Sequence, residues 1–316
     1  MAHEKSKSCS ASDLELLHRA AALLREGKLV AFPTETVYGL GANALDAHAV
    51  EKIFRVKGRP STSPVIVHIE SREAAPAFVV NWPADAEKLA REFWPGPLTL
   101  VVPKRECIPD IVTAGLPSVG LRVPANPFAL ALLVDAGVPI AAPSANRFTE
   151  LSPTTAEHVR KSLGNDVDLI LDGGPTQVGI ESTVLSLAGP KPTLLRPGMV
   201  SKEQIEQVIG KIEIAATPPD GAHPSPGMHP RHYSPRTPLT LYLPTTGRGA
   251  YLWRTRPAGS AQSVHMPAEP AAYAAALYET LHRLDEEHLE WIAVEPLPDE
   301  PGWAAIRDRL MRASST

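Results

Sequence analysis

The sequence predicts an α/β protein built from two units, with a sheet whose strands are largely buried. The chain has 316 residues, enough for one large domain or two smaller ones with a sizeable core. Short apolar runs alternate with helical patterns along the whole chain, which is typical of this class. Seven prolines fall within the 24 residues of 215–238. Because proline fixes φ and removes a backbone donor, we expect an extended connector there.

These observations divide the chain into a tail and two units joined by a linker. We expect a polar tail over 1–11, a large unit over 12–212, a proline-rich linker over 213–237 and a smaller α/β unit over 238–316. In the large unit, Ser12 and Glu15 form a capping-box pattern ahead of a helix that Gly27 closes. The other helices of this unit are expected from about residues 49, 86, 126, 154 and 201. Its strands are expected at 29–32, 64–69, 97–102, 118–123, 139–142, 168–172, 182–187 and 193–196.

The smaller unit has the same alternation. Apolar runs at 239–243, 249–253 and 263–266 precede a helical pattern over 270–287. A further strand pattern and a closing helix come next, at 291–296 and 303–314.

Composition excludes several classes of protein. The net charge of −4 provides no overall basic field for broad nucleic-acid binding. Cys9 and Cys107 form no CxxC pair, so a disulfide framework or zinc knuckle is not expected. The polar N-terminus has no apolar signal region, and no run approaches the roughly 18 apolar residues of a membrane span. A reduced, cytoplasmic protein without a membrane partner is therefore expected.

The segment PTETVYGLGANA, residues 33–44, combines ligand-binding side chains with two glycines. Gly39 and Gly41 fit a dinucleotide fingerprint, but six residues separate them from the strand. The region about 20 residues further on has no acid for a ribose. We expect Thr34 and Thr36 to face a ligand and Tyr38 to form a wall of the ligand pocket. The glycines are expected to turn the chain tightly into the next helix.

Cations recur at the ends of the predicted strands. Lys57 and Arg59 precede one strand, whereas Arg122 and Arg196 each end another, next to proline or glycine. Open α/β sheets bind ligands at strand ends, so these cations are expected to converge on one anionic ligand. Each of them, taken alone, is also compatible with a solvated surface charge.

Hydroxyl-rich turns accompany the cations. Short polar side chains and free backbone N–H groups in tight turns make anion sites, although the same residues also cap helices. His68 follows an apolar strand and is compatible with a structural role. His223, His229 and His232 have no carboxylate or thiol beside them, so we expect no metal bound by side chains. The turns supply Ser144, Asn146, Ser152, Ser182 and Thr183.

The motifs together resemble a known family. KGRP, PVIVHI, WPGPLTLVV, VGLRVP, APSAN, LDGG, GIESTV and LLRPG occur in the order found in the YrdC-like domain of threonylcarbamoyl-AMP synthases. PGMHPRHYSP and AIRDRLMRAS are similar to the linker and C-terminal domain of the two-domain members. The resemblance implies a twisted mixed sheet with helices around a deep positive cleft, plus a Rossmann-like domain. It also implies condensation of L-threonine, bicarbonate and ATP to threonylcarbamoyl-adenylate and pyrophosphate.

The resemblance also assigns the site residues. The implied phosphate contacts are Lys57, Arg59 and Arg196, with Mg²⁺ on the ATP phosphates. The implied L-threonine pocket contains Thr34, Thr36, His68, Arg122, Ala142 and Ser182. The remaining implied ATP contacts are Ser63, Ser118, Ser144, Asn146, Ser152 and, from the linker, Tyr233. The implied partner is a tRNA threonylcarbamoyl transferase complex, which modifies the adenosine next to the anticodon.

This chain departs from the usual family pattern at a few positions. Ser63 stands where Asn is usual, Phe148-Thr149 replaces a Ser-Gly pair, and Pro230 replaces an aromatic residue. The second unit is also short for the family. Two alternatives stay open: a carbamoyltransferase that forms carbamoyl-adenylate, and a noncatalytic double-stranded RNA-binding module with weak RNA affinity.

Overall fold

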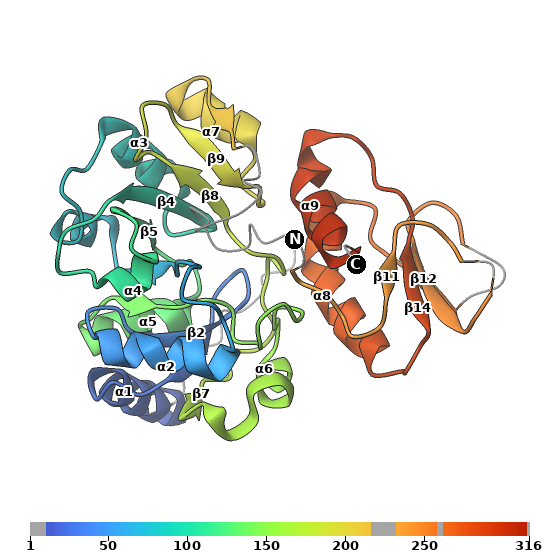
Figure 1. Ribbon diagram of the computed structural model, residues 1–316, viewed down its shortest axis with the longest axis horizontal. Coiled ribbons are helices and arrows are strands. Elements are labelled where there is room, and N and C mark those ends of the chain that lie inside the picture. Colours follow the sequence, from blue (N-terminus) through green and yellow to red (C-terminus); the bar gives the residue numbers. More distant parts are fainter. Residues whose placement is uncertain (1–10, 216–231, 245, 258–261, 315–316) are drawn as a thin grey trace.

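The computed structural model describes residues 11–215, 232–244, 246–257 and 262–314. Within these ranges the chain forms two α/β bodies that lie side by side and contact each other, as Figure 1 shows. The proline-rich segment 216–231, including Pro230, lies outside the described residues. No helix in the described ranges is long and apolar enough to cross a membrane.

The larger body is built on one mixed sheet. Its strand order is β10-β9-β8-β4-β5-β3-β6-β2-β1-β7. Parallel pairs (β3 with β5, β4 with β8) alternate with antiparallel ones (β4 with β5, β8 with β9), so the sheet is neither purely parallel nor a meander. The strands are β1 (Val30–Pro33), β2 (Tyr38–Asn43), β3 (Val67–His68), β4 (Leu98–Pro103), β5 (Ser118–Arg122), β6 (Ile140–Ala141), β7 (Leu169–Ile170), β8 (Thr183–Ser186), β9 (Thr193–Arg196) and β10 (Glu213–Ile214).

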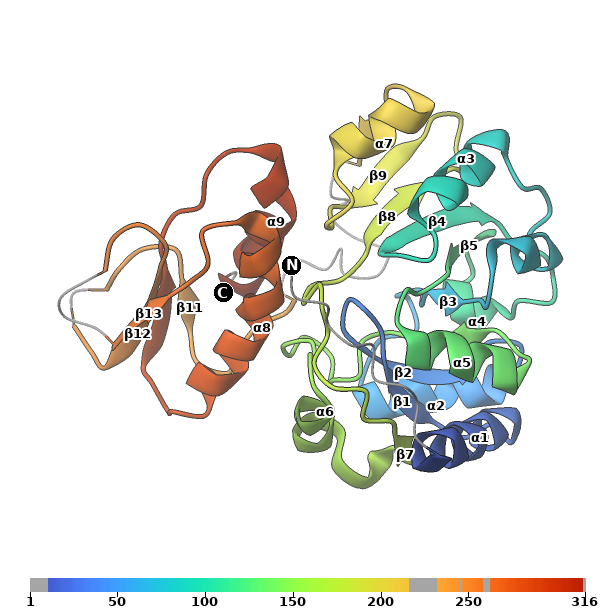
Figure 2. The ribbon, with the colours of Figure 1, turned by 180° about the vertical axis from the view of Figure 1, so that it is seen from behind.

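Helices surround this sheet, as the view from behind in Figure 2 shows. Helix α1 packs on α5, and their leucines enclose Phe32 of β1 in one core cluster. Asp46 caps α2, accepting bonds from the backbone N–H groups of His48 and Ala49, and Gly58 ends that helix at φ 63°. The helices are α1 (Ala11–Arg25), α2 (Ala47–Lys57), α3 (Ala84–Phe93), α4 (Asp110–Thr113), α5 (Pro127–Ala136), α6 (Ala156–Leu163) and α7 (Lys202–Ile209), with 3₁₀ turns η1 (Arg72–Ala77) and η2 (Gly164–Asp166).

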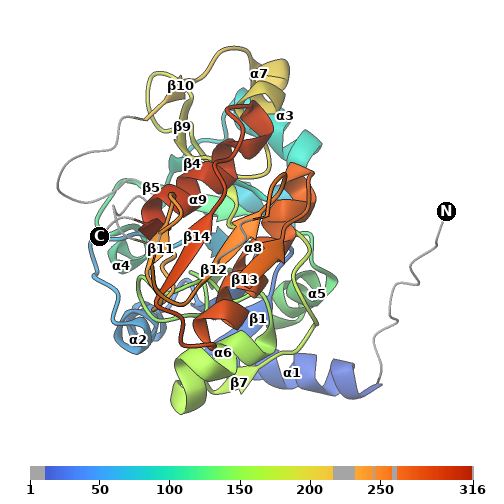
Figure 3. The same cartoon turned by 90° about the vertical axis from the view of Figure 1, so that its right-hand side faces the viewer.

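The smaller body is a parallel sheet of four strands in the order β11-β14-β12-β13. It consists of β11 (Leu239–Thr240), β12 (Gly249–Trp253), β13 (Gln262–His265) and β14 (Trp291–Val294), with α8 (Pro270–Asp285), η3 (Pro301–Trp303) and α9 (Ala304–Ser314). Helices α8 and α9 lie on the side that faces the large body, with the sheet on the far side (Figures 1 and 3). A parallel sheet with covering helices matches the Rossmann-like expectation.

Three local expectations need correction. Helix α1 begins at Ala11, so Ser12 lies inside the helix and is not its cap. Glu213 and Ile214, the first residues assigned to the linker, form β10 and pair with β9. Gly39 and Gly41 do not turn the chain: they lie in β2, antiparallel to β1.

Packing explains the glycine at position 41. A Cβ atom there would lie 2.8 Å from both Phe32 and Ile140. The pattern of two glycines in six residues therefore reflects close packing of β2 against β1 and β6. The sequence offered no clear alternation of apolar and polar residues by which to recognise this strand.

Candidate active site

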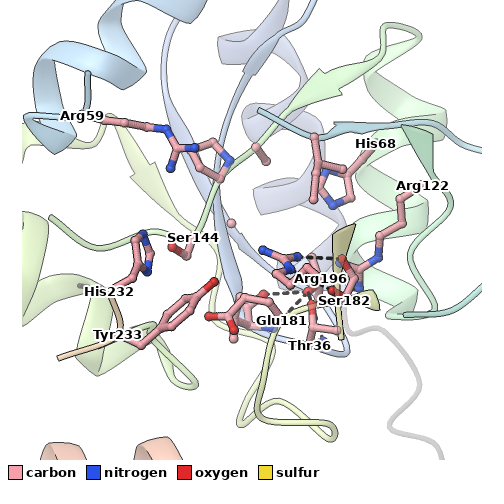
Figure 4. Close-up of a pocket in the computed structure, with 16 residues that line it drawn as sticks. Thr36, Arg59, His68, Arg122, Ser144, Glu181, Ser182, Arg196, His232 and Tyr233 are labelled. Atoms are coloured by element: carbon pink, nitrogen blue, oxygen red, sulfur yellow. Dashed lines mark hydrogen bonds between the residues drawn. The ribbon is translucent and has the colours of Figure 1, made fainter. Parts of the chain in front are cut away.

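A pocket that is partly open to solvent lies in the large body and is bordered by His232 and Tyr233 from the end of the linker. The strand-end cations Arg122 and Arg196 both line it, as does Arg59 (Figure 4). The expected convergence of these arginines is therefore present in the structure. The complete lining is Thr34, Thr36, Val37, Gly39, Arg59, Ile66, His68, Arg122, Ala142, Pro143, Ser144, Glu181, Ser182, Arg196, His232 and Tyr233.

The two threonines lie in the turn between β1 and β2. Thr34 Oγ1 donates to the carbonyl of Val37 and lies 2.8 Å from Thr36 Oγ1. The backbone N–H groups of Thr36 and Val37 both donate to Thr34 Oγ1. Thr34 therefore fixes the turn, and Thr36 Oγ1 accepts a bond from Arg122.

Arg122 is held from several sides at the end of β5. Its Nε donates to the Gly96 carbonyl at 3.2 Å and its Nη2 to Thr36 Oγ1 at 3.0 Å. Nη2 also lies 2.7 Å from Glu35 Oε1 in an ion pair whose geometry is not that of a hydrogen bond. Within the described ranges these contacts use Nε and Nη2, which leaves Nη1 for a ligand. Both side chains are buried, so the guanidinium is oriented before any substrate arrives.

His68 lies in register with Arg122 on the neighbouring strand β3. Burial, followed by the Arg122 charge, lowers the pKa of His68 to about 3, so the ring is neutral at physiological pH. Its Nδ1 is buried and has no hydrogen-bond partner within the described residues. A neutral ring nitrogen beside Arg122 can accept a bond from a ligand donor.

Arg196 and Ser182 form a second fixed pair. Arg196 Nε donates to the Ser182 carbonyl at 3.0 Å and Nη2 to Ser182 Oγ at 3.1 Å. Ser182 Oγ lies 2.9 Å from Thr99 Oγ1. Burial lowers the pKa of Arg196 from its ordinary value, but an arginine stays charged at neutral pH.

Arg59 approaches the pocket from the segment after α2. Its Nη2 donates to Ser63 Oγ at 2.6 Å and to the Pro64 carbonyl at 2.9 Å. Burial lowers its pKa to about 10, which leaves it charged at pH 7. Ser63 thus orients Arg59 and does not itself line the pocket.

Lys57 lies behind the pocket lining. Its Nζ donates to the carbonyls of Ser144 and Asn146, and so holds the turn that brings Ser144 to the pocket. Burial and the Arg59 charge lower its pKa well below the ordinary value. In this geometry Lys57 supports a wall of the site rather than facing a ligand directly.

Several other predicted contacts also lie outside the lining. Asn146 donates to the carbonyls of Arg147 and Glu150, and Ser152 Oγ donates to Glu181 Oε1 at 2.5 Å. Ser118 lines a separate, smaller pocket beside β4 and β5. Tyr38, expected as a wall, instead donates to the Gly174 carbonyl on the other side of β2.

Two titratable lining residues, Glu181 and His232, were not predicted from the sequence, and neither were the apolar lining residues Val37, Ile66 and Pro143. Glu181 and His232 are both buried and both stand beside a residue that was chosen, Ser182 or Tyr233. The segment GIEST did contain a signal for Glu181. It places an acid in the middle of a hydroxyl-rich turn, in a site that is otherwise rich in cations. Burial, followed by the charges of Arg59, Lys57 and Arg196, lowers the pKa of His232 well below its ordinary value.

The lining therefore combines three arginines with one carboxylate, and both of its histidines have lowered pKa values. Arginines fixed around one space are suited to binding a ligand with several negative groups, because the guanidinium forms charge-assisted hydrogen bonds with carboxylates and phosphates. The described residues contain no group of three or more His, Cys, Asp or Glu side chains placed to hold a metal ion. The fold and the pocket thus define a two-domain α/β protein with an arginine-lined pocket at the ends of its strands.

Comparison with known proteins makes the identification specific. Residues 22–198 match the family described as "Telomere recombination", and residues 200–315 match "Threonylcarbamoyl-AMP synthase, C-terminal domain". A threonylcarbamoyl-AMP synthase of Bacillus subtilis is 44% identical over 94% of this chain and 92% of its own length. One of Schizosaccharomyces pombe is 34% identical over 95% of this chain and 88% of its own length.

A solved structure extends the likeness to three dimensions. The Sua5 protein of Pyrococcus abyssi, crystallised with L-threonine, superposes with a TM-score of 0.88 at 39% identity, covering 94% of each chain. This chain belongs to the threonylcarbamoyl-AMP synthase family, in its two-domain form, and is a nucleotidyltransferase-type enzyme. The family resemblance and the fold class expected from the sequence are confirmed.

Proposed function

We propose that this chain condenses L-threonine, bicarbonate and ATP to threonylcarbamoyl-adenylate, with release of pyrophosphate, in the pocket described above. The observation that carries the proposal is the convergence of Arg59, Arg122 and Arg196 on one space. A substrate carboxylate and a triphosphate supply the negative charge that this space requires. The L-threonine complex of the Pyrococcus abyssi relative supports the amino-acid part.

Arg122 is the proposed partner of the threonine carboxylate. Its free Nη1 and the neighbouring hydroxyl of Thr36 face the pocket from one side, and His68 lies beside them. Ala142 uses its N–H to donate to the Ile66 carbonyl, so its own carbonyl is the backbone group left for the threonine amine. Thr34 and Ser182 complete this pocket, the former chiefly by fixing the turn.

Arg59 and Arg196 are the proposed phosphate contacts, with Ser144 and Tyr233 beside them. Lys57, Ser63, Asn146 and Ser152 act from behind by holding these groups, and a direct contact of Ser118 with ATP stays a prediction. Mg²⁺ enters as part of the MgATP substrate, coordinated by phosphate oxygens.

The proposed chemistry needs positioning more than covalent catalysis. The threonine amine attacks the bicarbonate carbon, water leaves, and a carbamate forms. A carbamate oxygen then attacks the α-phosphorus, and the bond from that phosphorus to the bridging oxygen of the β-phosphate breaks. Fixed arginines lower the barrier by stabilising the charge that develops on phosphate oxygens.

The product would supply a tRNA threonylcarbamoyl transferase, which modifies the adenosine next to the anticodon. Because that substrate is tRNA, we place the reaction in the cytoplasm. With β10 included in it, we assign residues 12–214 to the catalytic domain and 215–237 to a linker whose last residues, among them His232 and Tyr233, border the active site. The C-terminal domain then spans 238–316.

One assay tests the proposal. The protein is incubated with MgATP, bicarbonate and labelled threonine, and pyrophosphate is measured together with labelled adenylate. We expect both to require threonine, and we expect Arg59→Ala to reduce both to background. Arg55→Ala, an exposed arginine on α2, is the matched control and should keep full activity.

Two outcomes would contradict the proposal. Adenylate formation from carbamoyl phosphate, and not from threonine, would assign the chain to carbamoyl transfer. Inactivity with both, together with RNA binding that weakens with salt, would indicate an RNA-binding role.

A further inference from the structure

Arg309 is a fully buried arginine on α9 of the small body, and its guanidinium reaches the back of the pocket. Only 1% of the residue is exposed. Its Nε lies 2.6 Å from Glu181 Oε2, its Nη2 donates to the Pro197 carbonyl at 3.1 Å, and its Nη1 pairs with Asp308 at 2.6 Å. The guanidinium carbon also lies 5.0 Å from the ring centroid of Tyr233.

These contacts join three segments that each place a side chain in the pocket. Glu181 is itself in the lining and precedes Ser182, whereas Pro197 comes directly after Arg196. Tyr233 comes from the end of the linker. One guanidinium from the C-terminal domain therefore contacts all three of these segments.

Glu181 is the buried carboxylate with which Arg309 forms an ion pair. It is 6% exposed, and its carboxylate lies among cations that would otherwise serve a ligand. It accepts a bond from Ser152 Oγ at 2.5 Å and from the Tyr278 hydroxyl at 3.2 Å. Among the described residues, the cation that forms an ion pair with it is Arg309. Figure 4 shows Glu181 beside Tyr233 in the pocket.

The consequence for the pocket depends on charge pairing. A buried carboxylate without a cation is costly, so Glu181 would turn to the nearest remaining one. Arg196 is the cation placed for this: it lines the same pocket and donates to both the carbonyl and the hydroxyl of Ser182, the residue directly after Glu181. A carboxylate paired with Arg196 would compete with substrate phosphates for the same guanidinium.

We propose that Arg309 is a positioning residue for the synthase reaction: it pairs with Glu181 and so prevents that carboxylate from competing with the substrate phosphates for Arg196. The C-terminal domain would thereby complete a site that lies in the other domain. This rests on the proposed function, in which Arg196 binds phosphate.

The test compares Arg309→Met with the double variant Arg309→Met/Glu181→Gln. We expect the single variant to lose at least tenfold in kcat/KM for ATP, because Glu181 then takes Arg196. The double variant removes the competing charge, and we expect it to recover at least threefold over the single variant. If Arg309 were only a structural contact, the double variant would have a lower kcat/KM than the single variant, because each substitution would weaken domain docking further.

Matched controls keep the result interpretable. Arg307→Met changes an arginine on the same helix that pairs with Asp299 inside the small body, and should leave kcat/KM within twofold of the unmodified protein. The melting temperature of every variant is recorded. If Arg309→Met does not fold, Arg309→Gln keeps an amide donor for Glu181 without the charge, and the same two criteria apply.

Either of two results overturns the proposal. One is a kcat/KM for the single variant within twofold of the unmodified protein. The other is a double variant no more active than the single one. The proposed function fails separately, if the unmodified protein itself forms no threonine-dependent adenylate.

Discussion

Replacing Arg122 by lysine tests how the pocket recognises the threonine carboxylate. Arg122 gives its Nε to Gly96, shares Nη2 between Thr36 and Glu35, and keeps Nη1 for the ligand. A lysine ammonium has three donors at a single point. It cannot bond to Gly96, Thr36, Glu35 and the ligand carboxylate at the same time. We therefore expect the substrate carboxylate to lose its bond, because the buried Glu35 retains the cation.

The magnitude depends on the bond that is lost. A hydrogen bond to a charged group contributes about 1.5–3 kcal/mol. At 1.4 kcal/mol per factor of ten, this corresponds to a rise of roughly ten- to a hundredfold in the KM for threonine. The KM for ATP should stay within about twofold, because Arg122 contacts neither Arg59 nor Arg196 in the described structure.

The assay is a threonine titration at saturating MgATP and bicarbonate, read out by pyrophosphate release. Arg91→Lys, an exposed arginine on α3 paired with Glu87, is the control and should change neither KM. An unchanged KM for threonine in Arg122→Lys, or an equal rise in both KM values, would refute this reasoning.

Three further predictions concern Arg196, Gly41 and His68. Arg196→Ala should abolish threonine-dependent pyrophosphate release while circular dichroism stays unchanged, and normal turnover would remove Arg196 from the phosphate site. Gly41→Ala should lower the free energy of unfolding by about 1–3 kcal/mol, because its Cβ would lie 2.8 Å from Phe32; Gly189→Ala, with only a 3.9 Å contact, is the control in urea unfolding. The pKa of His68 is lowered to about 3, so stability is full above the unfolded value near 6.5 and falls as pH drops towards 3. His68 should contribute a slope of up to about 1.4 kcal/mol per pH unit, which His68→Asn should remove; equal slopes in both proteins would contradict this.

The arginines at strand ends were predictable because a strand fixes the position of the residues at its end. Arg122 and Arg196 each end an apolar run, and a sheet brings such ends to one edge. The two threonines were predictable for a similar reason, since they come directly after β1. These positions depend on local periodicity, which a single sequence shows.

The direction of side chains on irregular segments was not predictable. Lys57 is the last residue of α2, and its side chain points at carbonyls of a turn almost 90 residues later in the chain. Ser152 points at Glu181 rather than into the pocket for the same kind of reason. Such choices depend on tertiary contacts with no local signature.

Glu181 and Arg309 illustrate what one sequence leaves hidden. They are 128 residues apart and meet only because the small body packs on the large one. Each looks ordinary in its own segment, Glu181 among hydroxyls and Arg309 on a charged helix. Their pairing becomes visible only when both bodies are present.

The most direct test of the central claim is the stoichiometry of the reaction in a single turnover. The enzyme is mixed with MgATP, threonine and carbon-labelled bicarbonate, quenched, and analysed for adenylate and pyrophosphate. We expect the label in an adenylate that also contains threonine, in one-to-one ratio with pyrophosphate. Pyrophosphate release without threonine, or an adenylate without the bicarbonate carbon, would contradict the account.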